Sequence, residues 1–144
     1  MNPERKNFVL VMAAAAVFAV ATTAVAALTE STPAEQTQGT IHYMTGGRGK
    51  AEALGMRNAM MQYPLALEFV AGPRSHREYL PEVPVTIRDA SGAQVFDGVS
   101  GGPYLFIRLD AARYVVTAEH DGKVERREVE VPAKGTKRLL FVWK

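Results

Sequence analysis

The sequence contains no cysteine in its 144 residues. The chain therefore has no disulfide, no thiol nucleophile and no cysteine-based zinc site. Small secreted domains of eukaryotes commonly rely on disulfides, so an exported chain without cysteine fits a bacterial periplasm better.

Histidine is also scarce, since the chain has only His42, His76 and His120, which are 34 and 44 residues apart. A metal site favours two ligands at a short spacing on one element, or one histidine joined by well-placed carboxylates. We therefore expect solvated histidines, no metal site and no cofactor.

A recognisable set of catalytic residues is lacking. The serines stand in leader, loop or turn contexts, and none lies in the G-x-S-x-G elbow of a hydrolase. The aspartates recur near turns, where a carboxylate bonds its own backbone, and this explains them without calcium. The sequence favours a protein that is not an enzyme, with a hydrolase as the least favoured alternative.

An excess of charge of one sign is absent as well. Lysine and arginine number 17 and aspartate and glutamate 15, which gives a net charge of +2. The charge falls to +1 if Glu4, Arg5 and Lys6 are removed with a signal peptide. Nucleic-acid binding needs a strongly basic surface, and this balance predicts none.

Charged residues are missing altogether between Asn7 and Thr29. A short start with two cations, an apolar run and the small residues Ala24, Ala26 and Ala27 together form the layout of a secretory signal. We predict a signal peptide over residues 1–26, cleaved after Ala26, and a periplasmic location for the rest.

The same run also allows an uncleaved membrane anchor. Phe8 to Leu28 is 21 residues long, about the length that spans a bilayer. Such an anchor would keep Arg5 and Lys6 in the cytoplasm and the domain outside. The protein would then contact the membrane only through this segment. The high alanine content favours the cleaved signal.

The remaining chain divides into three parts. Residues 27–40 are polar and are predicted to form a flexible leader. Residues 41–62 contain a Gly-rich segment and one helix over Lys50 to Gln62, which Gly55 weakens and Pro64 ends. Residues 63–144 change to a period of two and are predicted to form a β-sandwich.

The strands of this sandwich are short and separated by turn signals. Asp89 to Gly92 forms one turn, and Asp121-Gly122 suits a type I′ hairpin. The stretch Glu125 to Glu128 is polar on both faces, which places its strand at an edge or beyond the core. Pro84 indicates an edge strand or the start of a strand. The fold class is mainly β, a single antiparallel β-sandwich of about seven strands with one short N-terminal helix after a signal helix.

Residues 83–143 carry a resemblance to a known family. Its motifs are Val83-x-Val85-x-Ile87-x-Asp89-x-x-Gly92, Gly102-Pro103-Tyr104-x-Phe106-x-x-Leu109 and Tyr114-x-Val116-x-Ala118. The pattern resembles the carboxypeptidase regulatory-like domain, a transthyretin- or prealbumin-like sandwich. One departure is that Asp110 to Arg113 stands where the family usually has a Pro-Gly pair.

The resemblance implies a structural or interaction module without catalytic residues. Hydroxyisourate hydrolases, which are catalytic relatives with a transthyretin-like fold, end in a Tyr-Arg-Gly-Ser signature. This chain ends in Phe141-Val142-Trp143-Lys144 and does not match it. The resemblance therefore also argues against an enzyme.

Three groups of residues are candidates for binding. A methionine cluster comprises Met44, Met56, Met60 and Met61. It can pack the helix onto the sheet, form a partner surface that adapts its shape or, as the least favoured alternative, bind copper(I). Four tyrosines are candidates for stacking against a sugar or another small ligand: Tyr43, Tyr63, Tyr79 and Tyr104. The glycines of Gly46 to Gly49 form either a flexible hinge or an anion cradle before the helix.

These observations predict an exported, non-enzymatic module that binds an envelope protein. The expected contact surface is residues 40–62 together with an open sheet edge, because edge strands accept another strand by main-chain hydrogen bonds. The alternatives are a carbohydrate- or small-ligand-binding module, or an inner-membrane protein anchored by its N-terminus with a periplasmic domain.

Overall fold

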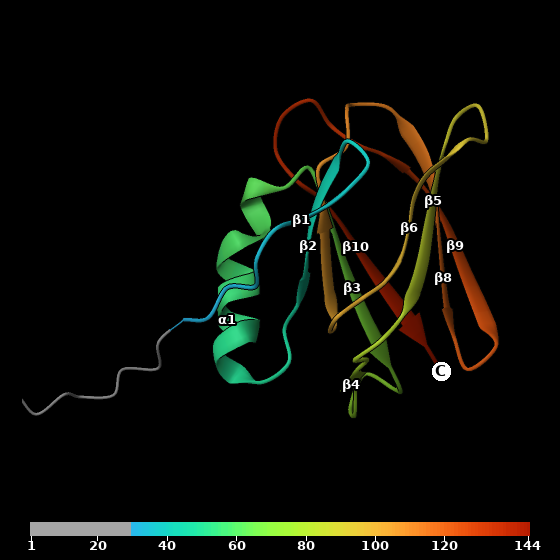
Figure 1. Ribbon diagram of the computed structural model, residues 1–144. Coiled ribbons are helices and arrows are strands. Elements are labelled where there is room, and N and C mark those ends of the chain that lie inside the picture. The colour runs from blue at the N-terminus through green and yellow to red at the C-terminus, as the bar shows by residue number, and fades with distance from the viewer. Residues whose placement is uncertain (1–29) are drawn as a thin grey trace, which may run out of the picture.

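A computed structural model describes residues 30–144. The predicted signal peptide, its cleavage positions and the apolar run lie outside the described residues. Two sheets face each other, and one helix lies beside them (Figure 1). In spatial order, the six-stranded sheet contains β1 (Gln36–Gln38), β2 (Ile41–Gly46), β7 (Tyr104–Ile107), β3 (Leu65–Ala71) and β10 (Lys137–Trp143), with β4 (Glu78–Tyr79) also paired to β3. The four-stranded sheet follows the order β6 (Gln94–Val99), β5 (Pro84–Asp89), β8 (Arg113–His120) and β9 (Lys123–Glu130).

Among residues 30–144, the mainly β class and the single helix are confirmed, and the strands number ten rather than the expected seven. Two of the unexpected strands, β1 and β4, are short and lack apolar alternation, and β1 lies within the predicted flexible leader. β2 also belongs to the six-stranded sheet. The predicted border between residues 41–62 and the sandwich therefore separates strands of one sheet. The sandwich is also not wholly antiparallel, because β10 runs parallel to β3 along its whole length.

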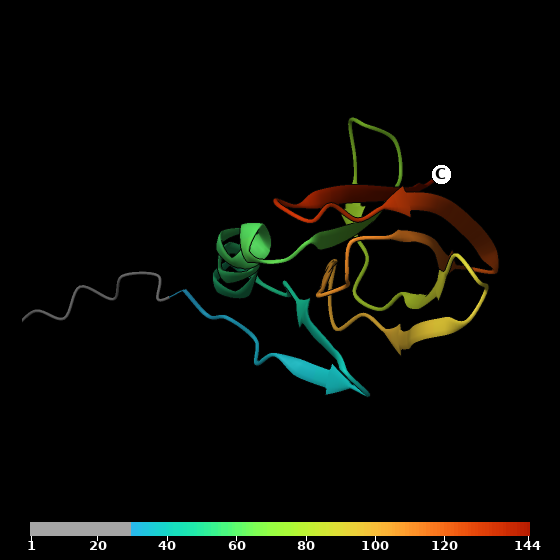
Figure 2. The ribbon, with the colours of Figure 1, turned by 90° about the horizontal axis from the view of Figure 1, so that it is seen from above.

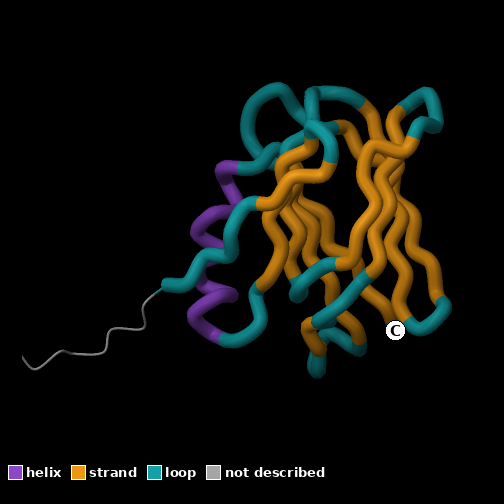
Figure 3. The backbone as a smooth tube through the Cα atoms, viewed as in Figure 1, coloured by secondary structure: helices purple, strands orange, loops and turns teal. Residues whose placement is uncertain are grey.

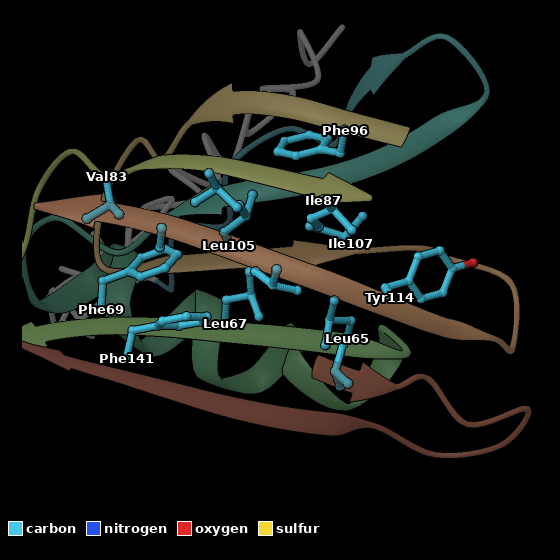
Figure 4. Close-up of a cluster of buried hydrophobic side chains, with 14 of the residues drawn as sticks. Leu65, Leu67, Phe69, Val83, Ile87, Phe96, Leu105, Ile107, Tyr114 and Phe141 are labelled. Atoms are coloured by element: carbon cyan, nitrogen blue, oxygen red, sulfur yellow. The ribbon is translucent and has the colours of Figure 1, made fainter. Parts of the chain in front are cut away.

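The main core lies between the two sheets and comes from alternate residues of the strands (Figure 4). Leu65, Leu67 and Phe69 of β3 are fully buried and face Ile87 and Val116 of the opposite sheet. Burying each such side chain stabilises the fold by about 1.5–3 kcal/mol. The period of two in the sequence therefore predicts this layer correctly.

The predicted turns are confirmed in detail. The Asp89 carboxylate accepts hydrogen bonds from the backbone N–H groups of Ser91 and Ala93 at 2.9 and 3.0 Å. Asp121 and Gly122 both have positive φ, 49° and 73°, as a type I′ turn requires. Each turn is thus set by a local hydrogen bond or backbone conformation.

The turn over Asp110 to Arg113 is held by side-chain and backbone contacts. The Tyr114 hydroxyl donates to the Asp110 carbonyl oxygen at 2.8 Å, and the Val131 N–H donates to the Ala112 carbonyl at 2.9 Å. These bonds fix the chain between β7 and β8 without glycine.

The edge assignment of the polar stretch is confirmed, and of the two alternatives for Pro84 the start of a strand is right and the edge strand is wrong. β9, which carries the polar stretch, is an edge strand, and Pro84 begins the interior strand β5. The sandwich is closed on one side by Gln38, whose side-chain amide donates to the Asp97 carbonyl and accepts from the Asp97 N–H at 2.6 and 2.9 Å. The side-chain amide of Gln38 thus makes the pair of hydrogen bonds that the backbone of a neighbouring strand would make.

The helix α1 (Lys50–Ala59) continues into a 3-10 turn over Met60–Gln62 and covers the outer face of the six-stranded sheet (Figures 2 and 3). Beneath it lies a second core formed by Met44, Met56, Ala59, Met60, Tyr63, Ala66, Tyr104 and Phe106. Gly55 is buried here, because the backbone of Ser31 lies where its Cβ would be, 2.2 Å from that position. The glycine that weakens the helix lets residues of the leader pack against it.

The methionine cluster is therefore mostly a packing feature. Met56 is fully buried, and Met44 and Met60 are 8% and 6% exposed, so these three cannot serve as an accessible partner surface. The sheet beneath the helix removes them from solvent. Only Met61, at 69% exposure, remains open to a partner.

Candidate functional site

Two glycine-rich loops meet beside the start of α1. A Cβ on Gly47, whose φ is 104°, would lie 2.5 Å from the Tyr104 ring, and a Cβ on Gly102 would lie 2.3 Å from the Gly46 carbonyl oxygen. Only glycine permits backbones to approach so closely. Gly47 and Gly102 are therefore required for the close packing of the two loops, whereas a Cβ on Gly49 would meet open space.

Glu52 stabilises this loop from the first turn of the helix. Its carboxylate accepts a hydrogen bond from the Gly47 N–H at 2.8 Å. The residue that caps the helix, Gly49, has no side chain to bond the first N–H groups of α1. The helix therefore begins at Lys50 without a side-chain cap.

Arg48 joins the loop to two other segments. Its guanidinium donates to the carbonyl oxygens of Gly101 and Pro81 at 3.0 and 3.1 Å and pairs with Glu82 at 3.2 Å. The cation is thus occupied by protein groups. Its role is to hold the walls of the site in place.

A groove of about 600 Å³ opens between α1, this loop and the segment before β5. Its lining is more apolar than polar and contains no carboxylate: Gly47, Arg48, Gly49, Lys50, Ala51, Ala53, Leu54, Arg57, Tyr79, Pro81, Pro103 and Tyr104. Lys50 and Arg57 are exposed and form no salt bridge among the residues described. Ligand pockets are typically apolar with a few such charged groups.

Two tyrosines form part of the groove wall. Tyr79 is 57% exposed, Tyr104 is only 3% exposed, and their ring centroids are 6.4 Å apart. Burial raises the pKa of Tyr104, and the negative charge of Glu68 raises it further, whereas Arg57 lowers it. The Tyr104 hydroxyl therefore remains a neutral group that can donate or accept a hydrogen bond at ordinary pH.

Glu68 lies opposite Tyr104 in the β3–β7 pairing. Its half-burial raises the pKa of the carboxyl, against the lowering effect of Arg138, Arg57 and Arg77. Glu68 itself does not line the groove.

Of the four tyrosines proposed for stacking, the structure brings Tyr79 and Tyr104 together and places the other two elsewhere. Tyr43 packs edge-on against Phe96 with ring centroids 5.0 Å apart. Tyr63 is buried in the second core and is 2% exposed. Arg57 was not among the residues predicted from the sequence, and its spacing from Lys50 along one helix was the available signal.

A second constellation of polar side chains surrounds Glu35. The Tyr63 hydroxyl donates to its carboxylate at 2.5 Å, and Arg108 Nε and His42 Nδ1 lie 3.2 Å from it. Arg108 also lies over the Tyr63 ring at 4.3 Å and donates to the Gln62 carbonyl. The hydrogen bond from Tyr63 is the largest of several effects that lower the pKa of Glu35. This set of contacts fastens the residues before β1 to the body of the fold.

Tyr63 is expected to ionise at a higher pH than an ordinary tyrosine. Burial and the adjacent Glu35 raise the pKa of Tyr63 from 10.0 to about 12. Because the folded-state pKa is raised, the resulting stability is complete below pH 10 and lost as the pH rises through about 12. In a tyrosinate absorbance titration, Glu35→Gln should move one tyrosine part of the way back toward 10, since burial remains. An identical titration curve for Glu35→Gln would contradict this coupling.

The histidines and serines occupy separate structural positions. His42 pairs with Glu35, and His120 lies 3.4 Å from Asp121 and beside the Trp143 ring. Ser100 is buried and accepts a hydrogen bond from the Val83 N–H at 2.9 Å. Within residues 30–144, no three His, Asp or Glu side chains are grouped for a metal ion, and no helix is long and apolar enough to cross a membrane.

A larger hollow, about 830 Å³, lies on the outer face of the four-stranded sheet. Its arginines stand among carboxylates, as where Arg113 faces Glu130 across β8 and β9. Opposite charges on neighbouring strands satisfy each other. The groove beside α1, with exposed cations and no lining carboxylate, is therefore the better candidate site.

Searches with protein-family models and against curated proteins found no match to this chain.

Proposed function

We propose that this protein is an exported, periplasmic and non-enzymatic β-sandwich of the carboxypeptidase regulatory-like kind, which binds an envelope protein through the groove beside α1. The observation that carries the proposal is the pairing of two exposed cations, Lys50 and Arg57, with an apolar wall in a preformed groove. The two-sheet architecture is consistent with the motifs that suggest the family.

The lining indicates the chemistry of the partner segment. Lys50 and Arg57 favour a carboxylate, while Leu54 and the Tyr79 ring favour an apolar or aromatic group beside it. Leu54 and Tyr79 are 37% and 57% exposed, so their burial by a partner would remove apolar surface from water. An acidic segment with one large apolar side chain fits this groove.

A charge-reversal experiment tests the proposal. We expect in-cell crosslinking of the tagged full chain, followed by recovery from the envelope and mass spectrometry, to yield one enriched partner. The variant Lys50→Glu/Arg57→Glu should lower that yield at least tenfold, because two charge-assisted contacts are reversed. The control Lys123→Glu/Arg126→Glu makes the same change in net charge on β9 and should retain the partner. Equal recovery of the partner with both variants would show that the groove is not the binding surface.

A small ligand that carries a ring and a carboxylate is the second candidate. The exposed Tyr79 ring, next to Lys50 and Arg57, favours it. A glycan and metabolite screen read by tyrosine fluorescence tests this candidate. A compound that stacks on the ring should still bind Tyr79→Phe and should fail to bind Tyr79→Ala. No response in the wild-type protein would exclude this candidate for the compounds screened.

A further inference from the structure

The strand β10 has a hydrogen-bonded neighbour on one side only. At its two ends, the Lys137 N–H donates to the Pro64 carbonyl and the Trp143 carbonyl accepts from the Gly72 N–H, both at 2.8 Å. In a parallel ladder, the residues that bond a given neighbour alternate along the strand. The N–H and C=O groups of the even-numbered residues Arg138, Leu140 and Val142 therefore point away from β3.

Nothing in the described chain satisfies these groups. β10 pairs with β3 alone, and no backbone hydrogen bond outside the ladders reaches its even-numbered residues between positions 30 and 144. Leu140 is 41% exposed, so β10 is open to solvent at its middle. β9 comes close at the C-terminal end, where the Trp143 indole donates to the Lys123 carbonyl oxygen at 3.0 Å.

The other strands at the ends of the two sheets, β1, β6 and β9, are each blunted, and β10 is not. β9 carries the charged stretch Glu125 to Glu128, and β1 has only three residues and is tied to β6 through Gln38. In β10, the segment Leu139 to Trp143 is entirely apolar and contains neither proline nor glycine. Natural sheets usually blunt such an edge or use it to accept another strand.

Charge distinguishes between the possible occupants. Lys137 and Arg138 lie at one end of β10, and Lys144 lies just beyond the other. A second copy paired antiparallel about Leu140 would bring Lys144 of one chain next to Lys137 of the other, and like charges there repel. A strand with carboxylates at both ends would instead meet cations at both ends.

We propose that the free edge of β10 is a strand-acceptor site for an extended segment of another polypeptide that alternates apolar residues and carries carboxylates at its ends. Main-chain bonds to Arg138, Leu140 and Val142 would supply the pairing, and the terminal charges would select the segment. This site is separate from the groove and does not depend on its function.

Amide hydrogen exchange, followed by NMR on the full chain, tests the site directly. In the free protein, the amides of Arg138, Leu140 and Val142 should exchange quickly, and those of Leu139 and Phe141 slowly. The probe is the synthetic peptide acetyl-Glu-Val-Thr-Val-Thr-Val-Glu-amide in excess. It should slow exchange of the three even-numbered amides at least tenfold and leave the others unchanged.

Three outcomes would overturn the proposal. The probe leaves the even-numbered amides fast, or these amides are already slow in dilute free protein, or their protection grows with protein concentration alone. The last result would identify a second copy as the occupant. A peptide with lysine in place of both glutamates serves as the matched probe, and we expect it to protect at least tenfold less. Equal protection by both peptides would show that the terminal charges do not select the bound segment.

A proline substitution gives an independent check. Leu140→Pro removes an N–H that points outward and leaves the ladder to β3 complete, whereas the control Leu140→Thr keeps that N–H. We expect the proline variant to lose at least tenfold in affinity for the acidic peptide and the threonine variant to retain it. Slow exchange at Leu139 and Phe141 verifies that β10 is still folded in the proline variant. If β10 is not folded there, the comparison of the two peptides on the wild-type protein remains a valid test of the site.

Discussion

Replacing Phe106 by alanine is expected to lower the free energy of unfolding by about 3–5 kcal/mol. Phe106 is fully buried in β7, at the centre of the core between α1 and the six-stranded sheet. Its ring lies between those of Tyr63 and Tyr104, with centroids 5.8 and 5.9 Å away. The three rings come from a helix end and a strand, so they cannot all move to fill the cavity.

The loss is large beside the total stability of a domain, which is about 5–15 kcal/mol. α1 is also too short to persist alone, because isolated helices of fewer than about 12–15 residues are marginal in water. We therefore expect the helix to be lost together with its packing on Phe106, and the groove with it.

Urea unfolding followed by far-ultraviolet circular dichroism measures this effect. The control is Met61→Ala, which lies beside the same core at 69% exposure and should change stability by no more than about 0.5 kcal/mol. A Phe106→Ala variant as stable as the Met61→Ala variant would show that the helix is not held by this core.

The predicted parts of the fold are those that local sequence determines. The alternation of Val85 and Ile87 specifies which face of β5 is buried, since a period of two places both on one side of a strand. The Asp121-Gly122 pair specifies the β8–β9 hairpin, because both residues adopt positive φ. Each of these features needs no information from distant segments.

The missed parts depend on partners that are remote in sequence. β1 is Gln-Thr-Gln, which has no apolar face, and it exists because β2 supplies its backbone bonds and Asp97 binds Gln38. The parallel pairing of β10 with β3 joins residues more than 70 positions apart, and alternation alone does not specify a neighbour.

The same distinction applies to the candidate site. The sequence indicates that tyrosines and helical cations are present, but not that Tyr79 and Tyr104 meet. They meet because β4 pairs with β3 next to the end of β7. Methionine burial was equally undetermined, since a helical stripe that contains Met56 can face a sheet or solvent. The geometry of the groove is therefore a tertiary property.

Gly102→Ala is expected to lower the free energy of unfolding by about 3 kcal/mol, at the upper end for overpacking a tight site. A Cβ at this position would lie 2.3 Å from the Gly46 carbonyl oxygen and 2.4 Å from its carbon. These are backbone atoms, so no side chain can rotate to make room. The loop that carries Arg48 must then move away from Pro103 and Tyr104.

The neighbouring Gly101→Ala is the matched control. A Cβ there meets Thr45 Cγ2 at 3.4 Å, an ordinary contact with a side chain, and its stability should change by less than about 1 kcal/mol. Urea unfolding of both variants gives the comparison, and partner recovery gives the second readout. Because Gly102→Ala displaces a wall of the groove, it should reduce recovery even under conditions where the protein remains folded. Similar unfolding curves for the two variants would mean that the close approach of these two loops is not what shapes the groove.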